Sequence, residues 1–185
     1  MQSDFRIEIA SQGWLPAAPG YDPVTQDLCT HGQIDLVIGS EVIVASGGDA
    51  SYGISEGALG LLRTLSADHS LRSRVSDRLI PHGCGAILMM GCPIGIDWSV
   101  THVGSTVRLD DIVRYDATSE SDAIRFPGLS ALIPHDLYRD EIVAFAQTAK
   151  EPFAGLEKVF GDEFDREQYG SFWDEYERLL AAAQA

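Results

Sequence analysis

Apolar and polar residues alternate in several short stretches of the first two thirds of the chain, which is the period of half-buried β-strands. Alternating or β-branched runs of this kind occupy residues 5–9, 34–38, 42–45, 94–103 and 106–115, and the continuous apolar run at 86–90 predicts a buried strand. Glycine with a polar residue at 39–41 and 104–105 predicts tight turns between neighbouring strands. Residues 124–126 and 129–133 predict a last hairpin around the Pro127-Gly128 turn signal. We therefore expect a mostly antiparallel sheet of about six to seven strands.

One helix is predicted inside this β-rich part. Ser55 is a suitable N-cap, and apolar residues then repeat at helical spacing through about Asp68. Gly57 and Gly60 lie within the repeat and weaken the helix by about 1 kcal/mol each relative to alanine. Either another element approaches the helix closely at the two glycines, or packing alone holds the helix.

Two more helices are predicted in the last third of the chain. The first runs from Pro134 to about Glu151, and the second begins after Asp162. Strands joined by short turns, followed by helices gathered at the end, are typical of the α+β class. We expect a single domain over residues 1–185, β-rich with one helix over 1–133 and helical over 134–185, with the two last helices packed on the sheet.

The excess of acidic over basic residues is the unusual feature of the composition. Thirteen Lys and Arg stand against 28 Asp and Glu, for a formal net charge of −15. A field of this sign repels phosphate backbones and anionic membrane surfaces, so neither nucleic acid nor membrane is expected as a partner, whereas association with a basic protein is favoured. No signal peptide and no run long enough to span a membrane is apparent, which predicts a cytoplasmic protein.

Cysteines and histidines are the candidate metal ligands of this sequence. The candidates are Cys29, His31, His82, Cys84 and Cys92. Three cysteines at these spacings do not suggest a disulfide framework, and a one-residue gap between paired ligands is not that of a zinc finger or ribbon. We therefore expect buried apolar cysteines and loop-capping histidines, with no metal and no cofactor.

Catalytic motifs are not evident. The glycine-rich segment 83–95 lacks the Lys-Ser/Thr of a phosphate loop, and no serine has the glycines of a nucleophile elbow. The sequence therefore favours a protein that is not an enzyme, without settling the question. The alternative is an enzyme or small-ligand-binding protein with its site near His82, Cys84 and His102.

Aromatic residues are interleaved with carboxylates near the C-terminus. Between Glu151 and Arg178, nine acids stand against three bases, a local net charge of −6. Such a surface offers anchors and charge to a basic protein, although aromatics at helical spacing are also typical of a core. The candidate binding residues are Trp14, Tyr21, Glu163, Asp165, Trp173 and Glu175, the first two in a Pro- and Gly-rich loop over residues 13–23.

No motif identifies a family. In size and charge the chain resembles the small acidic α+β proteins that bind and neutralise basic toxin domains in bacteria, of the immunity or antitoxin type. We therefore expect a non-enzymatic protein that binds a basic partner and occludes its surface. The identity of the partner and the oligomeric state stay open.

Overall fold

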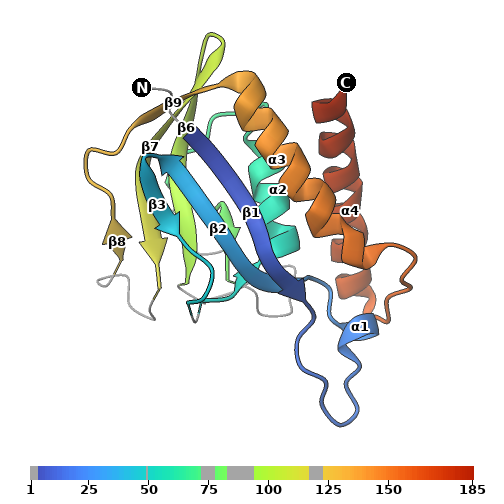
Figure 1. Ribbon diagram of the computed structural model, residues 1–185. Coiled ribbons are helices and arrows are strands. Elements are labelled where there is room, and N and C mark those ends of the chain that lie inside the picture. Colours follow the sequence, from blue (N-terminus) through green and yellow to red (C-terminus); the bar gives the residue numbers. More distant parts are fainter. Residues whose placement is uncertain (1–3, 49, 72–77, 83–93, 117–122) are drawn as a thin grey trace.

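Two antiparallel sheets and a group of helices make up the computed structural model of the chain (Figure 1). The structure describes residues 4–48, 50–71, 78–82, 94–116 and 123–185. The first sheet has the order β1-β2-β3, and β4 also pairs with β2. Its strands are β1 (Asp4–Gly13), β2 (His31–Gly39), β3 (Glu41–Val44) and β4 (Tyr52–Gly53). The predicted α+β class is confirmed.

The second sheet has the order β5-β6-β7-β8, and β9 also pairs with β7. Its strands are β5 (Ile80–Pro81), β6 (Gly95–Val103), β7 (Thr106–Tyr115), β8 (Ile124–Arg125) and β9 (Ala131–Pro134). The described strands thus form two sheets rather than the single sheet that we predicted. The strand predicted at residues 86–90 lies outside the described residues.

The predicted turns between neighbouring strands are present. Gly39 connects β2 to β3 with φ 64°, and Gly104 connects β6 to β7 with φ 60°. Both angles lie in the left-handed region, where glycine has no steric cost. The alternation of β1 is also realised, since Phe5 and Ile7 are buried and their neighbours point outward.

The predicted hairpin around Pro127-Gly128 is wrong. β8 and β9 do not pair with each other; both pair with β7, through Val113 opposite Arg125 and Val107 opposite Ile133. The chain therefore runs in one direction along the edge of β7, and a turn with Gly128 at φ 79° interrupts it. β7 has ten residues, so its single edge is long enough to accommodate both short strands.

Four α-helices are described: α1 (Pro23–Gln26), α2 (Ile54–Arg63), α3 (His135–Lys150) and α4 (Glu163–Gln184), with a 3₁₀ turn η3 (Glu151–Phe153) after α3. α1 begins at the last residue of the predicted loop, Pro23, and was not predicted. α2 ends before the predicted Asp68, because Thr64 closes it with a side-chain hydrogen bond to the Leu61 carbonyl. Within the described residues, no helix is long and apolar enough to cross a membrane.

One of the two glycines of α2 has a packing reason. A Cβ on Gly60 would lie 2.5 Å from the carbonyl oxygen of Leu79, whereas one on Gly57 would lie 3.4 Å from a methyl group of Ile80, an ordinary van der Waals contact. At Gly60 the segment that leads into β5 therefore approaches the helix at a distance that only glycine permits. Close approach, one of the two alternatives left by the sequence, is correct for Gly60.

The core joins both sheets to the helices. Phe5 of β1 packs against Trp98 of β6 and Tyr138 of α3, with ring centroids 6.4 and 4.8 Å apart. α3 lies beside β1, and α4 packs behind it on the outer side of the molecule (Figure 1). The buried Tyr176 of α4 donates a hydrogen bond to the Ala146 carbonyl of α3 at 2.7 Å, which fixes these two helices to each other.

Candidate partner-binding surface

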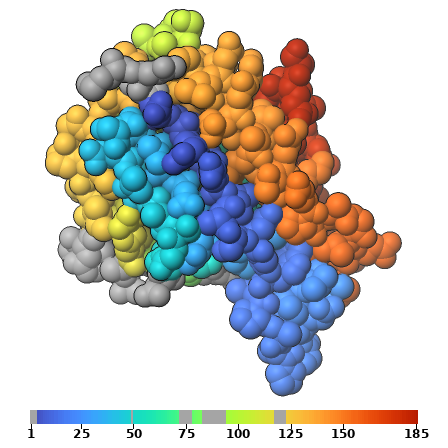
Figure 2. All heavy atoms as spheres, viewed as in Figure 1, coloured from blue at the N-terminus to red at the C-terminus, as the bar shows by residue number. Residues whose placement is uncertain are grey.

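The loop that follows β1 projects from the body of the molecule and carries α1 (Figures 1 and 2). Its tip is the turn from Ala18 to Tyr21, where the Tyr21 N–H donates to the Ala18 carbonyl at 2.9 Å. Pro19 followed by Gly20 at φ 79° is the residue pattern of a type II turn. Asp22 then caps α1 by accepting from the Val24 N–H at 3.1 Å. The projection is thus held in one conformation by its own turn chemistry.

Aromatic contacts anchor this loop to the C-terminal helix. Trp14 meets Phe153 edge to face, with centroids 4.9 Å apart, and Phe153 meets Trp173 at 4.6 Å. The structure therefore brings together two predicted binding residues, Trp14 and Trp173, through a residue between them. Both tryptophans are half-buried, so they support the loop more than they present a free surface.

Lys158 fastens the base of the loop from the other side. Its ammonium donates to the carbonyls of Val24 and Asp27 at 2.9 and 2.6 Å, and lies 3.6 Å from the centroid of the Trp14 ring. The next residue, Val159, donates its N–H to the Thr25 carbonyl at 2.8 Å. The segment before α4 is therefore a direct neighbour of α1, and the charge of Lys158 is directed inward.

We call residues 14–26 and 151–167 together the loop end. Val24, Val159 and Phe164 of the loop end are 41%, 56% and 57% exposed, three of the seven exposed large hydrophobic residues in the described chain. The loop end carries seven carboxylates and two basic residues, a formal net charge of −5. Exposed apolar side chains within a field of one sign are typical of a protein-binding surface.

The predicted acidic residues fall into two places. Glu163 and Asp165 lie in the first turn of α4, where Asp162 caps the helix by accepting from the Asp165 N–H at 2.9 Å. Glu175 lies farther along α4 and forms two hydrogen bonds with Arg63 of α2, at 2.8 and 2.6 Å. Arg63 lowers the pKa of Glu175, so this carboxylate stays charged and joins two helices. Glu175 thus forms a structural ion pair with Arg63 and lies outside the loop end.

Tyr21, the remaining predicted binding residue, lies at the end of the turn. Partial burial raises the pKa of its phenol, and the negative charge of the neighbouring Asp27 raises it further. Tyr21 therefore stays protonated and neutral. It lies close enough to the buried Asp27 for the charge of that carboxylate to act on its phenol.

The predicted metal ligands are partly brought together. Cys29 and His31 lie with Asp27 in one buried group, and burial lowers the pKa of His82. Cys84 and Cys92 lie outside the described residues. Asp27 was not among the predicted ligands, although Asp-x-Cys-x-His is a period-two pattern that places three side chains on one face of an extended chain.

His82 and His102, which the alternative hypothesis combined, lie in different places. His82 follows β5, which pairs with Gly95 at the start of β6, whereas His102 lies seven residues along β6, about 23 Å at 3.3 Å per residue. His102 bonds instead to Asp68, with Nδ1 2.9 Å from Oδ1. A cavity of about 450 Å³ is lined by residues 110–113 and 125–130, away from both histidines.

Comparison with known proteins does not identify a family. No protein-family model, no curated protein and no solved structure matches the chain. Function is therefore inferred from the loop end itself, including Val24 and Val159, which the sequence patterns did not indicate. Their exposure follows from how α1 and the segment before α4 meet, and no local pattern at either valine signals that contact.

Proposed function

We propose that the chain binds a basic partner protein through the loop end. The observation that carries this proposal is the exposure of Val24, Val159 and Phe164 within a surface of net charge −5. Apolar side chains that are desolvated on binding supply affinity, and complementary charge around them speeds encounter and selects the partner.

Preorganisation supports the same proposal. The type II turn, the aromatic contacts of Trp14 and the inward hydrogen bonds of Lys158 hold the projecting loop before any partner arrives. A surface that is already ordered loses less conformational entropy on binding, so more of the contact energy appears as affinity. Occlusion of a basic surface, as in proteins of the immunity or antitoxin type, is the mode of action that the charge and size favour.

Both basic residues of the loop end are engaged within it. Lys158 donates to the backbone carbonyl of Val24 at 2.9 Å, and Arg166 forms an ion pair with Glu163 at 3.3 Å. The exposed Asp22, Glu157 and Asp162 therefore face solvent beside the apolar side chains. A partner with lysine or arginine around an apolar contact matches this arrangement.

The test is a comparison of three immobilised proteins in lysate of the source organism. The wild-type chain is compared with Val159→Ser/Phe164→Ser and with the control Val42→Ser/Leu132→Ser, whose residues are comparably exposed on strands of the two sheets. We expect a basic protein to be retained by the wild type and the control, lost from the loop-end variant and released by salt. Equal retention by all three proteins would refute the proposal.

A further inference from the structure

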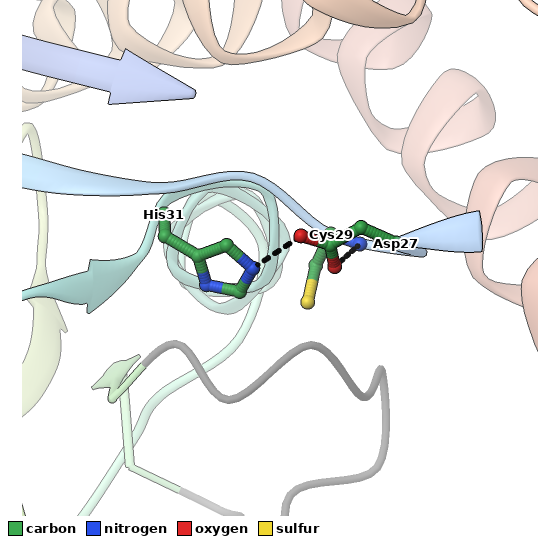
Figure 3. A group of neighbouring side chains, drawn as sticks. All are labelled: Asp27, Cys29 and His31. Carbon is green, nitrogen blue, oxygen red and sulfur yellow. Dashed lines mark hydrogen bonds and ion pairs between the residues drawn. The ribbon is translucent and has the colours of Figure 1, made fainter. Parts of the chain in front are cut away.

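Three potential metal ligands lie side by side beneath the projecting loop. Asp27, Cys29 and His31 occupy alternate positions leading into β2, and one ligand atom of each lies within 4.8 Å of the other two (Figure 3). Asp27 and Cys29 are 0% exposed, and His31 is 7% exposed. A thiol, an imidazole and a carboxylate that converge in the interior are the donor types of a zinc site.

The backbone around these side chains is fixed by α2. The Ile54 N–H donates to the Thr30 carbonyl at 2.8 Å, and the Thr30 N–H donates to Ser55 Oγ at 3.2 Å. Thr30 lies between Cys29 and His31, so the start of the helix holds the two ligands in register. Such support from neighbouring elements is what a preformed site requires.

Asp27 orients the imidazole. Its Oδ2 lies 2.9 Å from His31 Nε2 and also accepts from the Leu15 N–H at 2.9 Å. The Nε2 nitrogen and the Asp27 carboxylate therefore already face each other, with the thiol of Cys29 in the same group. A metal ion that takes the place of the proton between Nε2 and Oδ2 binds both groups, and the ring proton then lies on Nδ1.

Glu56 supplies an unsatisfied oxygen beside Cys29. It lies in the first turn of α2, is 9% exposed and forms a hydrogen bond with Cys29. Its Oε2 has no partner among the described residues, and it occupies space that Gly53 leaves open, since a Cβ there would lie 2.5 Å away. A buried carboxyl oxygen that has no partner among the described residues is costly to the fold, and a cation bound between it and the thiol would offset that cost.

We propose that Asp27, Cys29 and His31 bind a divalent transition-metal ion of the zinc class, with Glu56 as a fourth donor. Thiolate and imidazole select zinc or cobalt over magnesium and calcium, which prefer oxygen ligands. Bonds of about 2.0–2.3 Å put tetrahedral donors roughly 3.3–3.8 Å apart, so modest side-chain rotations close the site around the ion. Binding releases the thiol proton of Cys29 and the carboxyl proton of Glu56 to solvent, because both groups bind the ion as anions.

The site is structural rather than catalytic. Cys29 is wholly buried, so a protein substrate cannot reach its sulfur, and four protein donors leave no open position on the ion. Asp27 also accepts from Leu15, and its carbonyl accepts from Lys158. The ion therefore holds the base of the projecting loop against α2. This inference is independent of the proposed partner, because metal binding is measured on the chain alone.

Cobalt binding by the purified, untagged full chain is the experiment. Cys84→Ser/Cys92→Ser serves as the background, so that Cys29 is the one cysteine left. After chelator treatment and dialysis, we expect one equivalent of Co²⁺ to produce thiolate-to-cobalt charge-transfer absorption and tetrahedral visible bands. Zinc should abolish both signals by displacing the cobalt. Absence of charge-transfer absorption in this background would overturn the proposal.

Ligand variants complete the test. Cys29→Ser should abolish the charge-transfer absorption, and His31→Gln should weaken Co²⁺ binding by at least about tenfold. The nearly isosteric Glu56→Gln, checked by circular dichroism, should fold and also bind cobalt more weakly. The matched control is His102→Gln, a histidine that also contacts a carboxylate but lies elsewhere on β6. Unchanged binding by folded Cys29→Ser or His31→Gln would refute the site.

Discussion

Lys158 donates a hydrogen bond to the backbone carbonyl of Asp27 at 2.6 Å, across 131 residues of sequence. The contact joins the segment before α4 to the chain that leads into β2. Because Asp27 also holds His31 and Leu15, one lysine connects the exposed loop end to the buried group beneath it. The two proposed sites thus share a structural support while they use different atoms.

Removal of this support is the first prediction. Lys158→Met keeps the side-chain length but loses two charge-assisted hydrogen bonds, so the free energy of unfolding should fall by about 1.5–3 kcal/mol. Urea unfolding followed by circular dichroism measures the change. Arg108→Met is the control, because the exposed ion pair of Arg108 with Asp110 is worth at most about 1 kcal/mol. Equal effects of the two variants would contradict the assigned role of Lys158.

Two helical glycines should respond to alanine in opposite directions. Gly60→Ala in α2 puts a Cβ 2.5 Å from the Leu79 carbonyl oxygen, so we expect a loss of about 1–3 kcal/mol despite the better helix propensity of alanine. Gly170→Ala in α4 meets nothing within 4 Å, so a gain of about 0.5–1 kcal/mol is expected. Thermal unfolding of both variants measures the difference, and a stabilised Gly60→Ala protein would contradict the close packing.

The α+β class was predictable because it depends on local periodicity. Residues alternate in β1, and helical spacing repeats in α3 and α4, so each pattern indicates its element without its neighbours. The turns at Gly39 and Gly104 were predictable for the same reason, since a single residue supplies the left-handed backbone that each turn needs.

Pairing over longer distances was not predictable in this way. β8 and β9 read as a hairpin because a Pro-Gly signal separates them, but the free edge of β7 binds both strands. The loop end depends equally on a remote contact, since the Val159 N–H meets the Thr25 carbonyl. Within the candidate metal site, only the alternate spacing of Asp27, Cys29 and His31 is a local signal. The position of Glu56 beside Cys29 depends on how α2 packs, which no local pattern indicates.

Stability of the metal-free protein should depend on pH through Glu56. Burial raises the pKa of Glu56 from 4.5 to about 8. Between these values the folded chain retains a proton that the unfolded chain has lost, so stability should fall as pH rises, by up to about 1.4 kcal/mol per pH unit. Urea unfolding from pH 5 to 8 with a chelator present measures the slope. Glu56→Gln should show a flatter profile, and parallel profiles would contradict the assignment to Glu56.

The acidic residues at the start of α4 should control how fast a basic partner associates. Glu163→Gln/Asp165→Asn removes two charges from the loop end, so we expect the association rate to fall by roughly tenfold at low salt, with little change in the dissociation rate. Phe164→Ser should act in the opposite manner, because loss of an apolar contact mainly speeds dissociation.

Stopped-flow or surface-based kinetics with the retained basic protein measures both rates. The matched control is Asp136→Asn/Asp140→Asn, which removes the same charge from the exposed side chains at the start of α3. If the control slows association as much as the loop-end variant, the overall charge of −15 directs the encounter, and the loop end has no special part in it. If only the loop-end variant is slow, the local field next to Phe164 guides the partner to this surface.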